Sequence, residues 1–230
     1  MKRFWTNADV VEAGDGFGIA LDSKTVKTPA RAELVVPSRA LADAIAAEWN
    51  STGETIEPRA MPLTGLANAA IDRVGPDRQR FAAGIARYAE SDLTCYRAEG
   101  PTKLVARQAE SWDALLGWAR RRYDVDFACV QGVMHVAQPD ETLRKIGHAV
   151  AALDDFALAG LSPLVSIGGS LVAGLAVLEE AIPVETAWEA VSLDDRWQLE
   201  QWGADAEAEA MLDTRRGDFM AAARFLDLLR

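Results

Sequence analysis

Six carboxylates lie close together near the end of the chain, where they could bind a cation or perform acid–base catalysis. No histidine lies near them in the sequence, and no fixed spacing aims one carboxylate at another. Trp197 and Trp202 are interleaved with these acids, and tryptophan beside charge is typical of protein–protein interfaces. We therefore interpret the cluster as a solvated helix face or a binding surface, with a metal-binding or small-molecule enzyme site near Trp202 as the alternative. The carboxylates are Asp194, Asp195, Glu200, Asp205, Glu207 and Glu209.

A glycine-rich segment near the N-terminus could be mistaken for a nucleotide-binding motif. Gly14, Gly16 and Gly18 alternate with other residues, but a dinucleotide fingerprint needs a strand before it and a helix after it. Here the strand-like residues 17–21 follow, so we interpret the glycines as a hairpin turn. The sequence contains no GxxxxGK[ST] motif, and ATP binding is not predicted.

The histidines and cysteines form no recognisable metal or catalytic pattern. His135 and His148 lack the HExxH or ExxH spacing that directs two ligands to one metal. Cys95 and Cys129 form no CxxC pair, and neither has a partner base that the sequence can identify. We expect structural roles for the two histidines and place Cys129 in the core, and we predict no metal and no cofactor.

The composition indicates a folded protein with an acidic surface. The chain has 230 residues, of which 50% are hydrophobic, and a formal net charge of -11. This length allows one or two domains. A negative charge of this size repels phosphate groups, and no basic stripe is visible, so nucleic-acid binding is not expected.

One uncharged stretch, 156–178, is long enough to cross a bilayer. It is interrupted at Ser162-Pro163 and again at 168–170, and acidic residues flank it on both sides. No lysine or arginine is present there to set an orientation in the membrane. We therefore predict two buried helices separated by a break, and no membrane insertion.

Strand and helix patterns predict an α+β fold with two domains. Short apolar runs separated by turn residues indicate an antiparallel meander over 10–36. A helix from Arg39 to Trp49 follows, with Ser38 as its N-cap. The texture becomes helical near Pro76, so we predict an α+β domain over 1–75 and a larger, all-helical domain over 76–230.

The predicted second domain contains several amphipathic or apolar helices. In one of them, 103–123, Trp112 lies on the apolar stripe. Ser192 and Asp195 resemble a capping box at the start of another. The predicted helices span 76–89, 103–123, 141–153, 156–161, 168–179, 184–191, 193–202 and 205–229.

A series of short motifs runs along nearly the whole chain in a consistent order. They are Lys2-Arg3-Phe4-Trp5, Lys27-Thr28-Pro29-Ala30, Ala47-Glu48-Trp49, Met61-Pro62-Leu63-Thr64, Ala70-Ile71-Asp72, the segment 91–98, Gln108 with Trp112-Asp113 and Leu116, Leu153-Asp154 with Phe156, Gly169-Ser170-Leu171, and 200–209 around Trp202-Gly203. Together they resemble the ATP-twelve chaperone family, which assists assembly of the catalytic head of F-type ATP synthase.

The resemblance implies a chaperone and not an enzyme. Its expected partner is the free alpha subunit of ATP synthase, held transiently at the surface that the beta subunit later occupies, without ATP or another cofactor. The family's emphasis on the acidic segment after the Trp-Gly pair points to one residue, Glu207, as the main contact. Its expected neighbours in the partner-binding site are Asp205, Glu209, Glu200 and Trp202.

Two other tryptophans in the matching motifs are expected to stabilise the fold. Trp49 on the inner face of the first helix would bury a large area, and Trp112 lies on the apolar stripe of the predicted helix 103–123. The N-terminal residues show no apolar or Arg-rich targeting leader. We therefore expect a bacterial cytoplasmic protein, or a processed chain of the mitochondrial matrix.

Overall fold

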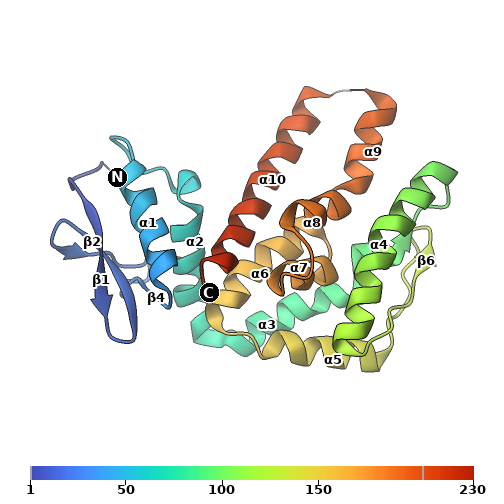
Figure 1. The fold of residues 1–230 in the computed structure, drawn as a ribbon, viewed down its shortest axis with the longest axis horizontal. Coiled ribbons are helices and arrows are strands. Elements are labelled where there is room, and N and C mark those ends of the chain that lie inside the picture. Colours follow the sequence, from blue (N-terminus) through green and yellow to red (C-terminus); the bar gives the residue numbers. More distant parts are fainter. Residues whose placement is uncertain (1, 204) are drawn as a thin grey trace. The chain divides into compact units, whose positions relative to one another are not determined.

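The computed structural model describes residues 2–203 and 205–230 and shows a small antiparallel sheet near the N-terminus followed by a mostly helical part (Figure 1). This confirms the predicted α+β fold class. Packing divides the chain into two compact units. The first contains the residues up to Arg78 together with 154–160 and 224–230, and the second contains 79–153 and 161–223. The division into domains over 1–75 and 76–230 stays a prediction. The two units differ from it because the segments 154–160 and 224–230 belong to the first unit.

The sheet of the first unit is organised around its second strand. The strands are β1 (Ala8–Ala13), β2 (Gly16–Leu21), β3 (Lys24–Thr25) and β4 (Val35–Val36). β2 pairs antiparallel with each of the other three. Gly14 has φ +58° in the β1–β2 turn, a conformation that glycine adopts without strain. The hairpin interpretation of the glycine-rich segment is therefore confirmed.

Helix α1 (Arg39–Ser51) packs on this sheet. It begins as predicted, because the Ser38 hydroxyl accepts a hydrogen bond from the backbone N–H of Leu41. Trp49 is buried at the other end of the helix, and its ring lies 5.2 Å from that of Trp5 in an edge-to-face arrangement. These side chains join one continuous apolar core beneath the sheet.

The sequence did not predict the helix that follows, α2 (Pro62–Ala69), which continues as a π-helical turn, η2 (Ala70–Val74). Its N-terminus is capped from a distance by Glu48 on α1. The two carboxylate oxygens of Glu48 accept hydrogen bonds from the backbone N–H groups of Leu63 and Thr64, both at 2.8 Å. Pro62 at the first position of α2 is a local signal for a helix start, but the capping side chain lies far upstream in the sequence.

Most of the predicted helices of the second part of the chain are present. They are α3 (Arg78–Ala86), α4 (Thr102–Tyr123), α5 (Asp140–Ala151), α6 (Asp155–Gly168), α7 (Leu171–Leu178), α8 (Val184–Val191), α9 (Leu193–Trp202) and α10 (Ala206–Asp227). The second unit is not entirely helical, because β5 (Tyr96–Arg97) and β6 (Val130–Gln131) form a parallel ribbon.

The predicted break at Ser162-Pro163 is wrong, because α6 continues through Pro163 to Gly168. The neighbouring Leu161, Leu164 and Val165 are fully buried, and burial on this scale offsets the cost of about 3 kcal/mol that a proline inside a helix carries. The chain turns after α6, and the Ser170 hydroxyl caps α7 by accepting from Ala173. In the described ranges, no helix combines the length and apolar character that crossing a bilayer requires.

Two smaller expectations are also wrong. Cys129 is exposed and does not lie in the core. Ser192 does not form a capping box with Asp195, because its hydroxyl donates to the carbonyl of Trp188, one turn back along the chain. Asp195 is therefore available for a different partner.

Candidate functional site

Helices α9 and α10 lie side by side as a hairpin whose turn positions the acidic residues (Figure 1). Helix α9 ends at Trp202, where Gly203 adopts φ +90°. The side chain of Asp205 accepts a hydrogen bond from the backbone N–H of Glu207 at 3.0 Å, which satisfies a free donor at the start of α10. Glu207 and Glu209 lie in the first turn of α10, where negative charge complements the helix dipole.

Two carboxylates of the sequence cluster are fastened to α4. Asp194 accepts a hydrogen bond of 2.7 Å from the side-chain amide of Gln108. Glu200 forms an ion pair with Arg107 at 2.6 Å, and the guanidinium of Arg107 also lies 5.0 Å from the centre of the Trp197 ring. These contacts hold α9 against α4, and the charge of Glu200 is compensated by Arg107.

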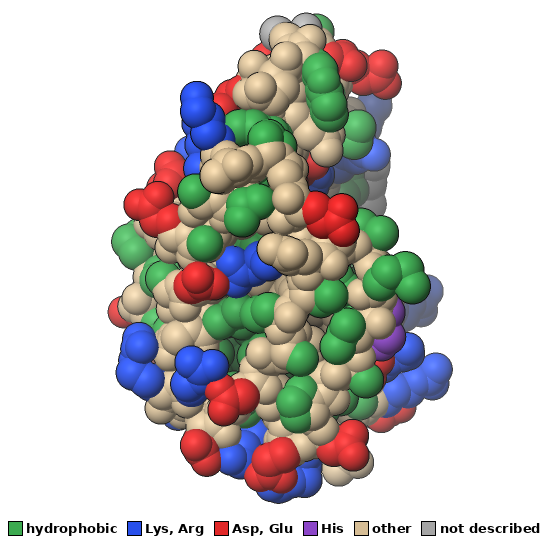
Figure 2. Space-filling model, turned by 90° about the vertical axis from the view of Figure 1, so that its right-hand side faces the viewer, with side chains coloured by type: hydrophobic (Ala, Val, Ile, Leu, Met, Phe, Trp, Pro, Cys, Tyr) green, Lys and Arg blue, Asp and Glu red, His purple; other side chains and the backbone are tan. Residues whose placement is uncertain are grey.

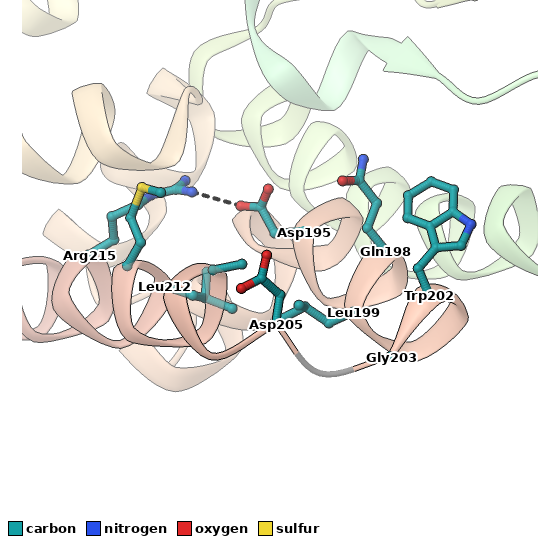
Figure 3. A pocket seen from close by; sticks show the side chains of 10 residues that line it. Asp195, Gln198, Leu199, Trp202, Gly203, Asp205, Leu212 and Arg215 are labelled. Carbon is teal, nitrogen blue, oxygen red and sulfur yellow. Dashed lines mark hydrogen bonds and ion pairs between the residues drawn. The ribbon is translucent and has the colours of Figure 1, made fainter.

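A cavity of about 430 Å³ lies between α9 and α10 (Figure 3). Asp195 and Arg215 form an ion pair of 2.8 Å in its wall, and Arg215 also donates to the carbonyl of Ile167 at 3.1 Å. Figure 3 shows Trp202 on α9 at the end of the cavity opposite this pair. The arrangement braces the hairpin, because the arginine joins three segments of the unit.

The hairpin brings together only part of the predicted partner-binding site. Trp202 and Asp205 line the cavity, whereas Glu200, Glu207 and Glu209 are exposed outside its lining. Within the described part of the chain, Glu207 and Glu209 form no ion pair. Across all described residues, no group of three or more histidines, cysteines or acids is placed to hold a metal. Two uncompensated negative charges thus lie near a tryptophan that is 81% exposed.

A second hollow, which we name the ribbon groove, lies between α9 and the β5–β6 ribbon and has a volume of about 830 Å³. Figure 2 views this side of the second unit and shows hydrophobic side chains interspersed with charged and other ones, with acidic side chains near the hairpin tip at the top. The apolar lining includes Leu93, Leu104, Val133, Met134, Trp197 and Trp202. Trp202 therefore borders both the groove and the cavity.

The sequence interpretation missed Val133 and Met134, which are 93% and 76% exposed. A signal for them exists, because two large apolar residues directly after Gly132 occupy a loop, where polar residues are the rule. Exposed apolar side chains gathered around a groove indicate a binding surface more strongly than scattered ones do.

Comparison with known proteins decides the family. A sequence profile described as "ATP12 chaperone protein" matches residues 2–120, just over half of the chain.

The chain belongs to the ATP12 chaperone family.

This confirms the resemblance inferred from the motifs, and with it the general function of an ATP synthase assembly chaperone. The relatives of the chain include a curated protein, "Protein atp12, mitochondrial" of Schizosaccharomyces pombe. It is 26% identical over 220 residues, which cover 90% of this chain and 75% of the relative.

Two crystal structures are closely similar to this ATP12 family chain. Atp12 from Paracoccus denitrificans is 40% identical with a TM-score of 0.94, and the match covers 100% of this chain and 98% of that one. The Atu1473 protein of Agrobacterium tumefaciens is also 40% identical, with a TM-score of 0.95 and coverage of 100% and 86%. The fold described here is therefore shared with both crystal structures.

Several residues of the ATP12 motifs have internal structural tasks. Asp92, in the motif 91–98, is fully buried and accepts four hydrogen bonds, from the backbone N–H and hydroxyl of Thr94, the hydroxyl of Ser170 and the backbone N–H of Val172. Burial raises the pKa of Asp92, and these hydrogen bonds act in the opposite direction. Asp92 thus joins the start of α7 to the turn before β5.

Trp49 and Trp112, two tryptophans of the ATP12 motifs, are also buried. Trp112 is completely buried and donates from its indole N–H to the carbonyl of Ala190 at 2.8 Å. Trp49 is buried in the first unit, away from solvent. Neither side chain is accessible to a partner, and a stabilising role for both stays a prediction.

Proposed function

We propose that this chain holds the free alpha subunit of ATP synthase, covers the apolar surface that the alpha subunit later presents to the beta subunit, and releases it when the beta subunit arrives. The observation that supports this most directly is the hairpin tip, where exposed Trp202 lies near the uncompensated carboxylates of Glu207 and Glu209. We place the contact there, with Glu207 as its centre and Asp205 and Glu200 beside it.

The composition of the tip suits a holding function. A subunit of an obligate complex exposes a large apolar surface before assembly, and that surface aggregates unless it is covered. A chaperone must cover the surface and later let it go, which favours a partly polar contact of moderate affinity. Exposed charges accelerate association and select the partner more than they add affinity. Release by competition needs neither ATP nor another cofactor.

The place of action follows from the client. ATP12 relatives include a mitochondrial protein and bacterial proteins. The proposed function puts this chain where the catalytic head of ATP synthase is assembled, which is the cytoplasm of a bacterium or the matrix of a mitochondrion.

An enzymatic or metal-binding use of the acidic cluster has weaker support. Asp194, Asp195 and Glu200 are each engaged by a neighbouring side chain, and Asp205 caps α10. The described carboxylates therefore act mainly as structural partners, and those left over are exposed and not gathered around a cavity.

The test is a refolding assay of the isolated alpha subunit, followed by light scattering and by co-purification. We expect the wild-type chain to bind the alpha subunit and suppress its aggregation, and the Glu207→Lys variant to do so less well. Glu185→Lys is a matched control, because Glu185 is also an exposed second residue of a helix. Equal protection by all three proteins would remove Glu207 from the site, and no binding by the wild type would overturn the proposed function.

A further inference from the structure

The exposed apolar side chains of the ribbon groove are held in place by a defined turn. The backbone N–H of Gly132 donates to the carbonyl of Arg97 at 2.8 Å. Gly132 has φ +83°, and a Cβ atom there would lie 3.0 Å from a carboxylate oxygen of Glu99. The turn therefore requires glycine, and it fixes the positions from which Val133 and Met134 project.

The groove has the features of a site for an apolar peptide. Its volume of about 830 Å³ is comparable with sites that bury most of a drug-sized ligand. Met134 on one wall is flexible and polarisable, which lets it adapt to different side chains. Trp202 on the opposite wall offers the type of large, rigid anchor that dominates binding energy at interfaces.

The charges around the groove favour a cationic partner. Arg97, the arginine of its lining, is neutralised by an ion pair of 2.7 Å with Asp113. Glu99 also lines the groove, and across the described residues it forms no ion pair. Glu207 and Glu209 add further negative charge in the first turn of α10. The charged side chains that line the groove are thus Glu99, Asp194 and the paired Arg97, a balance that favours a cation in the partner.

We infer that the ribbon groove binds an apolar segment of the client that is followed or preceded by a lysine or arginine. The inference rests on the proposed function and adds the part of the client that is recognised. In this arrangement the apolar side chains of the segment lie between Met134 and Trp202, and its cation lies near Glu99. The hairpin tip and the ribbon groove then form one continuous binding surface that shares Trp202.

The test uses the full chain with a photo-crosslinking amino acid in place of Met134 and the isolated alpha subunit as the client. Mass spectrometry of the crosslinked product is expected to identify a client peptide with a run of apolar residues and a lysine or arginine within a few positions. In parallel, the Val133→Ser/Met134→Gln double variant is expected to bind the client roughly tenfold more weakly or worse. Val136→Ser is the control, because Val136 lies in the same loop at 36% exposure but does not line the groove.

The charge component has its own test. Glu99→Gln is expected to weaken binding at low salt and to reduce the dependence of the affinity on ionic strength. If the wild type binds the client while the double variant binds equally well and no client crosslink forms at position 134, the groove inference fails and the proposed function stands. A crosslink to a second copy of this chain would also overturn it, in favour of self-association. If the wild type does not bind the alpha subunit at all, both proposals fail together.

Discussion

Replacing Asp92 tests how the second unit is held together. In the Asp92→Asn variant, the amide oxygen can still accept the three hydrogen bonds from Thr94 and Ser170, but the amide nitrogen then faces the backbone N–H of Val172. One buried donor loses its acceptor, which costs about 1–3 kcal/mol. Asp92→Ala leaves the backbone N–H groups of both Thr94 and Val172 without an acceptor, so we expect a loss of about 2–6 kcal/mol.

The pH dependence of the same variant follows from the direction of the pKa shift. Burial raises the pKa of Asp92 above its ordinary value of 3.8, so the folded protein binds this proton more tightly than the unfolded chain does. The stability contributed by this group is therefore greatest below pH 3.8 and falls as the pH rises through the folded pKa. Asparagine removes this fall, so the stability difference between wild type and Asp92→Asn is expected to narrow with rising pH.

The measurement is the free energy of unfolding by denaturant, at several mildly acidic and neutral pH values. Asp213→Asn, an exposed aspartate on α10, is the control and should leave the stability unchanged. A loss of less than about 1 kcal/mol in Asp92→Ala would refute the view that Asp92 is a required acceptor. If the stability difference between wild type and Asp92→Asn widened with rising pH, the four hydrogen bonds would outweigh burial and lower the pKa of Asp92.

Two further predictions concern packing and thiol chemistry. A Cβ atom at Gly174 would lie 2.8 Å from a methyl group of Val165, so Gly174→Ala should lower the free energy of unfolding by about 1–3 kcal/mol. The control is Gly147→Ala, which has open space around it and should stabilise α5 by about 0.5–1 kcal/mol. If denaturant unfolding gave the same effect for both variants, the close packing of α6 and α7 would be contradicted. Burial raises the pKa of the Cys95 thiol, whereas Cys129 is exposed. A maleimide reagent should therefore label Cys129 alone in the native protein and both thiols after denaturation. Labelling of Cys95 in the native protein would show that its environment is open to solvent.

Much of the fold could be predicted because its signals are local. The cap of α1 by Ser38 and the β1–β2 turn at Gly14 each depend on residues adjacent in the sequence. The start of α2 was missed although Pro62 marks it, because its cap is the side chain of Glu48 on another helix. The uninterrupted α6 was missed for a related reason, since tertiary burial around Pro163 overrides the local preference for a break.

The candidate site was predictable only in part. Sequence shows that acids and Trp202 are close along the chain, but it does not show which acids are already paired with other side chains. Arg107 and Arg215, which neutralise Glu200 and Asp195, come from distant parts of the sequence. The ribbon groove is likewise assembled from separate segments, so Met134 and Trp202 become neighbours in one surface only after folding.

The core of the first unit includes residues from the far end of the sequence. Phe225 is fully buried there, stacked on Phe156, and the hydroxyl of Ser38 donates to the carbonyl of Leu228. The ribosome releases the sheet and α1 long before the segment 224–230, so the first unit to be synthesised cannot complete its core on its own during translation. Until that segment emerges, the nascent chain exposes apolar side chains that the finished fold buries. The proposed client, the free alpha subunit, would likewise expose apolar surface until its own partner covers it.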